Sequence, residues 1–115
     1  MESKVFEFGN YIWECKTSYT DPGGGIGVNR LSSSIASVTK RWENGKMPSG
    51  YYYVFPVNLV SNDARGVLEN FAKAYEGEID INYYDRNQMQ KLIHRLNKMS
   101  DMNSLVNYIE QHWKE

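Results

Sequence analysis

Alternating apolar and polar positions near the N-terminus predict a β-hairpin. Residues 4–8 alternate in this way and form the first predicted strand. Gly9-Asn10 is a favoured turn of two residues, and residues 11–16, Tyr-Ile-Trp-Glu-Cys-Lys, return as a strand of mainly β-forming side chains. Because side chains alternate along a strand, we expect Glu14 and Lys16 to share one face.

After a glycine-containing loop, the pattern alternates between helices and short strands. Apolar residues spaced by four, three and four positions predict a helix over 30–42, and the uncharged run at 51–57 predicts a buried central strand. Turn and cap signals divide the remainder into three helices and one strand. The first of these helices is opened by Ser61-Asn62-Asp63 and closed by Gly77, and a half-buried strand follows at 79–83. A helix over 86–96 has capping-box spacing at Asp85 and Gln88, and an amphipathic helix covers about 101–114.

The predicted order of elements is therefore β-β-α-β-α-β-α-α. A hairpin that leads into alternating helices and strands indicates an α/β fold, with a mixed four-stranded sheet flanked by helices. The 115 residues contain no internal repeat and fit a single domain over 1–115.

Charge and cysteine content narrow the function classes. The formal net charge is -1 and the isoelectric point is about 6.1, which is less basic than expected for a protein that binds DNA mainly through phosphate contacts. A nuclease is not excluded, because metal-binding carboxylates lower the total charge. The single cysteine, Cys15, allows no intramolecular disulfide, and the N-terminus has no apolar signal region. These features predict a cytoplasmic protein.

Glu14 and Lys16 are the first candidates for chemistry. They place a carboxylate beside an ammonium group at the end of an otherwise apolar strand. Magnesium prefers oxygen ligands and can activate water, while an ammonium group can orient that water or stabilise developing charge. Glu-x-Lys also occurs by chance on solvated strand faces, and this alternative stays open from the tripeptide alone.

The sequence around this pair resembles a known family. Tyr-Ile-Trp-Glu-Cys-Lys at 11–16 is similar to the third motif of the PD-(D/E)XK nuclease superfamily, in the hydrophobic-Glu-Cys-Lys version of Mrr-type restriction-endonuclease-like domains. The resemblance continues through the glycine loop at 24–27, the predicted helix and apolar strand, and the Ser/Asp/Ala segment at 61–65. It covers about 4–97 and implies a restriction-endonuclease-like core, with the helix at about 101–114 lying beyond it.

The resemblance also implies an activity. The domain would be a metal-dependent nuclease that hydrolyses phosphodiester bonds in DNA, within a restriction, defence or repair system. Glu14 would bind Mg²⁺ or Mn²⁺, the backbone carbonyl of Cys15 would face the metal, and Lys16 would be the catalytic lysine. A homodimer is expected, because cleavage of a duplex needs two sites.

The chain departs from the family at the preceding strand. It lacks the usual Asp there, and it also lacks the helix that commonly precedes that strand. Glu2 lies at a suitable separation, but a two-residue turn would pair Val5 with Glu14 and direct Glu2 to the opposite face unless a bulge intervenes. Glu7 has the correct face but lies nearer the turn.

Three alternatives follow from the missing Asp. Glu2 replaces it as a metal ligand and catalytic residue, or the chain is a piece of a larger nuclease, or the site is inactive. In the last case the domain would bind a protein partner or dimerise, with the final helix as the docking element.

Basic residues on the third predicted helix are candidates for nucleic-acid binding. Lys91, Arg95 and Lys98, together with His94, recur on one helix face and form either a phosphate-contacting stripe or an ordinary solvated surface. A second small basic group consists of Lys40, Arg41 and Lys46. By contrast, Cys15 and the run Tyr51 to Tyr53 are expected to pack in the core.

Overall fold

The computed structural model describes residues 3–16, 25–55, 62–99 and 102–112. The elements follow the predicted order: β1 (Ser3–Phe8), β2 (Tyr11–Lys16), α1 (Gly25–Asn44), β3 (Gly50–Val54), α2 (Asn62–Ala74), β4 (Asp80–Tyr84), α3 (Arg86–Leu96) and α4 (Asn103–His112).

The strands form one mixed sheet in the order β1-β2-β3-β4. The β1–β2 pair is antiparallel, and the β2–β3 and β3–β4 pairs are parallel. Gly9 takes a φ of 63° in the hairpin turn, a left-handed conformation that glycine adopts without steric cost. The turn pairs Val5 with Glu14, as predicted. The predicted α/β class and mixed four-stranded sheet are thus confirmed.

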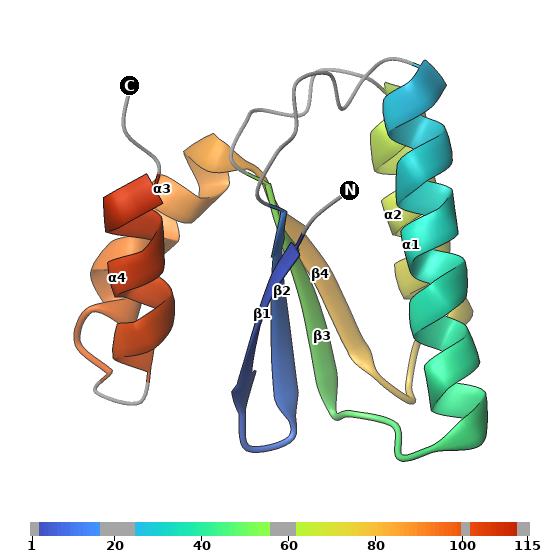
Figure 1. Ribbon diagram of the computed structural model, residues 1–115, viewed down its shortest axis with the longest axis horizontal. Helices are drawn as coiled ribbons and strands as arrows, with labels where there is room; N and C mark the ends of the chain where they lie inside the picture. The colour runs from blue at the N-terminus through green and yellow to red at the C-terminus, as the bar shows by residue number, and fades with distance from the viewer. Residues whose placement is uncertain (1–2, 17–24, 56–61, 100–101, 113–115) are drawn as a thin grey trace.

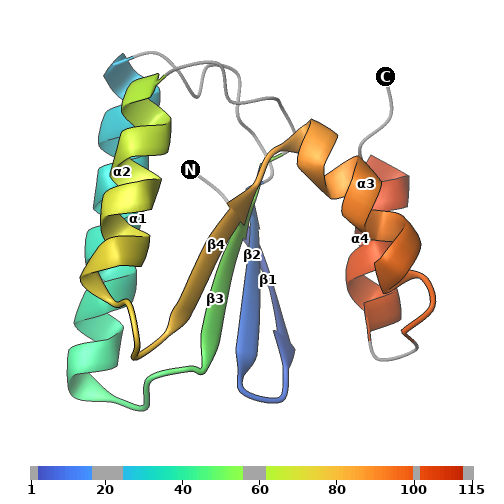
Figure 2. The ribbon, with the colours of Figure 1, turned by 180° about the vertical axis from the view of Figure 1, so that it is seen from behind.

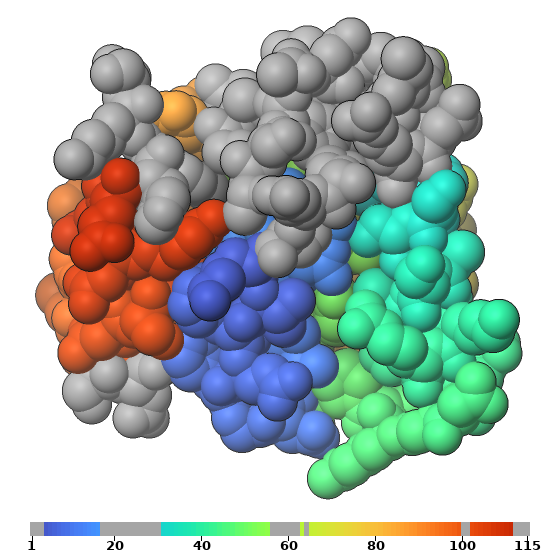
Figure 3. Space-filling model, viewed as in Figure 1, coloured from blue at the N-terminus to red at the C-terminus, as the bar shows by residue number. Residues whose placement is uncertain are grey.

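Helices cover both faces of the sheet. The connections β2–α1–β3 and β3–α2–β4 step along the sheet in the same direction, so right-handed crossovers place both helices on one face. Figures 1 and 2 show α1 and α2 side by side there, with α3 and α4 on the other face. In the space-filling view, the hairpin is exposed between α4 and α1 (Figure 3).

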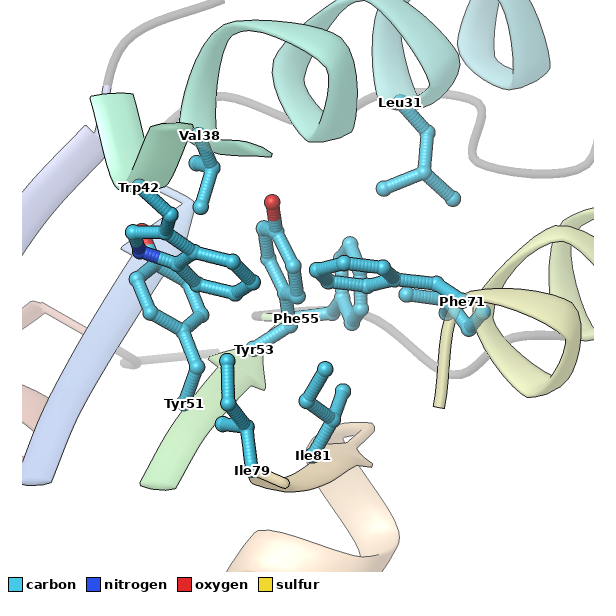
Figure 4. Packing of buried hydrophobic residues seen from close by; sticks show 10 residues of the cluster. Leu31, Val38, Trp42, Tyr51, Tyr53, Phe55, Phe71, Ile79 and Ile81 are labelled. Atoms are coloured by element: carbon cyan, nitrogen blue, oxygen red, sulfur yellow. The ribbon is translucent and has the colours of Figure 1, made fainter. Parts of the chain in front are cut away.

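The first core lies between the sheet and the α1–α2 layer. Tyr51 and Tyr53 of β3 point into it, and Figure 4 shows the Tyr53 ring directed toward α1. Trp42 stacks on Phe71 with ring centroids 5.8 Å apart, which ties α1 to α2. The buried members of this cluster are Leu31, Val38, Trp42, Tyr51, Tyr53, Phe55, Leu68, Phe71, Ile79 and Ile81.

The second core lies between the opposite sheet face and the α3–α4 layer. Cys15 is fully buried in it, and Tyr52 is nearly so, which confirms the expectation that Cys15 and the three tyrosines pack. The cluster consists of Trp13, Cys15, Tyr52, Val54, Met89, Leu96, Met102, Leu105, Val106 and Ile109. The apolar residues of α4 that the structure describes are covered within the chain, and docking of a partner by this helix stays a prediction.

The helix predicted over 30–42 begins earlier in the structure than the sequence pattern indicated. Helix α1 begins at Gly25, so residues 25–27 belong to the helix and not to the predicted glycine loop. Glycine in a helix costs about 1 kcal/mol, mainly in backbone entropy. Burial of Leu31, Val38 and Trp42 along the same helix outweighs that cost. Residues 21–24 and 56–57 lie outside the described part of the chain.

None of the helices described is long and apolar enough to cross a bilayer.

Candidate active site

Glu14 and Lys16 lie at the carboxyl end of β2, on the face covered by α1 and α2. Glu14 is 4% exposed and Lys16 is 2% exposed. Lys16 Nζ forms an ion pair with Glu14 Oε2. The predicted common face is therefore confirmed, but these side chains do not form a solvated strand surface.

Three further side chains from the described residues join the pair in a polar cluster. Lys16 Nζ donates to Ser34 Oγ at 2.9 Å, and Ser34 Oγ lies 3.3 Å from Glu14 Oε2. The Tyr51 hydroxyl donates to Glu14 Oε1. Lys16 Nζ also lies 5.2 Å from the centroid of the Tyr53 ring. Every polar group of the pair is thus fixed by neighbours on α1 or β3, and we call these five residues the Glu14–Lys16 cluster.

The two tyrosine hydroxyls in this cluster remain protonated near neutral pH. Burial raises the pKa of Tyr51, and the negative charge of Glu14 raises it further. Burial and the same carboxylate also raise the pKa of Tyr53. A protonated phenol donates a hydrogen bond, which is the role of Tyr51 toward Glu14 Oε1.

Sequence reasoning missed Ser34, Tyr51 and Tyr53 as members of this cluster. Ser34 is a polar residue at i+3 from Leu31 and i−4 from Val38, which are buried residues of the same helix. A polar residue on an apolar helix face is a signal that could have found it. The tyrosines face Glu14 because β3 runs parallel to β2, with Tyr53 paired to Glu14. That pairing depends on the sheet topology.

The position of the cluster in the sheet suits a functional site. The carboxyl ends of the parallel strands β2, β3 and β4 lie at the same edge of the sheet. In open α/β sheets, ligands bind outside this edge. The Glu14–Lys16 cluster lies at the carboxyl end of β2, where Lys16 contacts Ser34 of α1, and Figure 1 shows α1 alongside the sheet.

The donor groups fit a divalent metal only in part. The Glu14 carboxylate is a suitable oxygen ligand for Mg²⁺, and the Cys15 carbonyl is adjacent in the chain. Within the described ranges, however, no three His, Cys, Asp or Glu side chains come together as a metal site. Both oxygens of Glu14 already accept hydrogen bonds. The described residues therefore supply one carboxylate, and further ligands would have to come from elsewhere.

Among the described residues, the other acidic candidate lies away from Glu14. Glu7 is exposed and pairs with Ile12, two positions nearer the turn than Glu14, as the sequence predicted. Glu2 lies outside the described residues, so its expected role stays a prediction.

The two basic groups occupy opposite sides of the molecule. Lys91, Arg95 and Lys98 are exposed on or just after α3, which packs on the sheet face away from Glu14. The structure does not bring them together with the Glu14–Lys16 cluster. Arg41 lies nearer the cluster than the basic residues of α3 do. Its positive charge partly counters the rise in the pKa values of Tyr51 and Tyr53. A cleft of about 450 Å³ beside it is lined by Ser37, Lys40, Arg41 and Asn44.

Cys15 lies on the opposite face of the sheet from the cluster, and its thiol is unreactive. Burial raises the pKa of its thiol to about 12, with a smaller contribution from the negative charge of Glu14. A protonated, buried thiol is a poor nucleophile and a poor metal ligand.

Comparison of the chain with known proteins gave no match to a family model, a curated protein or a solved structure.

Proposed function

We propose that this domain is a metal-dependent nuclease of the PD-(D/E)XK type that hydrolyses phosphodiester bonds in DNA. One observation carries the proposal. The carboxylate of Glu14 and the ammonium of Lys16 lie side by side at the carboxyl edge of the parallel strands, within a sequence that resembles the hydrophobic-Glu-Cys-Lys motif. A restriction-endonuclease-like core over about 4–97 is part of the same proposal.

Each member of the cluster has a role in this proposal. Glu14 would provide an oxygen ligand for the metal, and the Cys15 carbonyl would provide a second. Bound Mg²⁺ or Mn²⁺ would supply an activated water and neutralise charge on the phosphate. Lys16 holds a positive charge next to the reacting phosphate, where low dielectric strengthens its effect. Ser34 and Tyr51 position the ammonium and the carboxylate through their hydrogen bonds.

The exposed basic residues suggest how DNA would approach. Lys40 and Arg41 lie on α1, which covers the same sheet face as Glu14. They are suited to phosphate contacts next to the proposed site. Lys91, Arg95 and Lys98 would contact DNA only if it continued around to the α3 side.

Cleavage of plasmid, single-stranded DNA and RNA with Mg²⁺ and with Mn²⁺ tests the proposal. We expect metal-dependent DNA cleavage that falls by about a hundredfold or more in Glu14→Gln and in Lys16→Met. Glu7→Gln is the matched control, because Glu7 faces the same side from an exposed position. It should retain activity. Circular dichroism of each variant gives the folded fraction by which its activity is normalised. Full cleavage by folded Glu14→Gln would contradict the proposal.

A second candidate is an inactive nuclease-like fold that binds a protein partner or forms a dimer. It is favoured by the closed state of the cluster: within the described part of the chain, no buried side-chain nitrogen or oxygen lacks a hydrogen-bond partner. A purely structural pair can often be replaced by apolar residues of similar size without loss of stability. This candidate predicts that Glu14→Leu/Lys16→Met folds normally and that the wild-type chain cleaves none of the substrates.

A further inference from the structure

A second cleft lies on the other face of the sheet, beside the hairpin turn. It has a volume of about 730 Å³, within the range of small-molecule sites. The hairpin turn and the start of β4 border it on the sheet side, and the carboxyl end of α3 borders it on the helix side. These segments lie at the same end of the molecule, the lower end in Figures 1 and 2.

Aromatic rings form the floor of this cleft. The rings of Trp13 and Tyr52 have centroids 4.7 Å apart, and those of Trp13 and Tyr84 lie 5.6 Å apart. The Tyr11 ring stacks parallel to Tyr52 at 6.4 Å and is 46% exposed. Four ring systems from three adjacent strands therefore meet at one surface, and we call them the aromatic floor.

Gly50 makes this arrangement of rings sterically feasible. A methyl group at this position would lie 2.6 Å from the Tyr11 ring and 2.6 Å from the Tyr52 hydroxyl. Both distances are far below van der Waals contact, so the rings can lie across β3 only because Gly50 has no side chain.

The carboxylate of Asp80 lies at the edge of the floor. Asp80 Oδ2 accepts a hydrogen bond from the Tyr52 hydroxyl at 2.8 Å, and Asp80 Oδ1 accepts one from Asn82 Nδ2 at 3.2 Å. Both donors are neutral, and Asp80 forms no ion pair within the part of the chain that the structure describes. The carboxylate therefore brings an uncompensated negative charge to an aromatic cleft.

We propose that this cleft binds an organic cation, specifically a methylated ammonium group. Aromatic faces attract cations through their quadrupole, and recognition of quaternary ammonium by aromatic residues is a recurrent use of this effect. Asp80 adds direct charge complementarity. Leu92, Leu96 and Met102 line the cleft as well and provide apolar contacts for the methyl groups.

A nucleotide fits the cleft less well than this cation. A base could stack on the tyrosines, but its phosphate would have to approach the carboxylate of Asp80. Nucleotide binding is therefore an outcome that would contradict the proposal. The cleft is also separate from the Glu14–Lys16 cluster, so the proposed nuclease activity does not bear on it.

Titration with choline, and with its neutral carbon isostere 3,3-dimethylbutan-1-ol, tests the charge requirement. The two probes have nearly the same shape, so a difference in affinity reports the cation. We expect choline to shift the amide and side-chain NMR signals of Trp13 and Tyr52, with an affinity at least about tenfold higher than that of the isostere. Equal affinities, no binding of choline, or tighter binding of adenosine monophosphate would overturn the proposal.

Variants then locate the site. Tyr11→Ala removes an exposed ring, and Asp80→Asn removes the charge while keeping an oxygen that can accept from Tyr52. We expect each to weaken choline binding by about tenfold. Asp63→Asn, an exposed charge change on α2, is the matched control and should leave affinity unchanged. Unchanged affinity in folded Tyr11→Ala and Asp80→Asn would exclude this cleft as the site.

Discussion

At the scale of single residues, the unusual feature is a lysine buried as completely as the core leucines. Lys16 is 2% exposed, and its charge is balanced by Glu14 and supported by Ser34. Burial of a charge is costly, so each partner depends on the other. The pair is therefore stable in the core only when both residues are present.

Removal of Lys16 alone should therefore be strongly destabilising. We expect Lys16→Met to lower the free energy of unfolding by about 3–5 kcal/mol, because it leaves the Glu14 carboxylate buried without its cation. Urea denaturation measures the change. Lys40→Met, at an exposed position on α1, is the control and should change stability by less than about 0.5 kcal/mol. A loss for Lys16→Met as small as the control's would contradict the burial of the pair.

Alkaline pH should also destabilise the fold. Burial raises the pKa of Cys15 from 9.0 to about 12 and raises those of Tyr51 and Tyr53 above 10.0. Above about pH 9 the unfolded chain therefore loses these protons before the folded chain does, and the free energy of unfolding falls as pH rises. Urea denaturation between about pH 7 and about pH 10 measures this slope. Tyr51→Phe should reduce it, and a slope that is flat or of opposite sign would contradict the account.

At the scale of elements, β3 contributes to both faces of the sheet through Gly50 and the tyrosines that follow it. Gly50 leaves space for two rings on the side of α3, while Tyr51 reaches Glu14 on the side of α1. One short strand therefore contributes to both the Glu14–Lys16 cluster and the aromatic floor.

Alanine substitutions at two glycines distinguish the space that Gly50 leaves for the rings from the ordinary effect of glycine on the backbone. Gly50→Ala should destabilise the protein by about 1–3 kcal/mol, because the new methyl group overlaps Tyr11 and Tyr52. Gly66→Ala in α2 meets no atom within 4 Å and should stabilise it by about 0.5–1 kcal/mol through higher helix propensity. Thermal or urea unfolding measures both. If Gly50→Ala matched Gly66→Ala in sign, the close packing over Gly50 would be disproved.

The elements that the sequence predicted best are those with local signals. The Gly9-Asn10 turn fixed the hairpin register, and Asp85 with Gln88 forms the expected capping box at the start of α3. Residues 25–27 were predicted as a loop because glycine composition masked the continuing helix. At the candidate site, the alternation along β2 predicted the common face of Glu14 and Lys16. It gave no indication that α1 would cover them.

At the scale of the whole molecule, the two proposed sites lie on opposite faces of the sheet. The Glu14–Lys16 cluster lies on the face covered by α1, and the aromatic floor lies on the face covered by α3. Trp13 and Glu14 are neighbours in β2, yet they belong to different sites because side chains alternate. This separation allows variants of either site to be interpreted independently.

Binding of Mn²⁺ followed by NMR tests whether Glu14 belongs to a metal site, and it needs no knowledge of the substrate. Mn²⁺ broadens the signals of nuclei near its binding site. If Glu14 belongs to a metal-dependent active site, the signals of residues 14–16 and of Ser34 should broaden in the wild type and recover in Glu14→Gln, while those of Asp80 and Asn82 stay sharp. Sharp signals at residues 14–16, or broadening that persists in Glu14→Gln, would show that Glu14 is not a ligand of a metal-dependent active site.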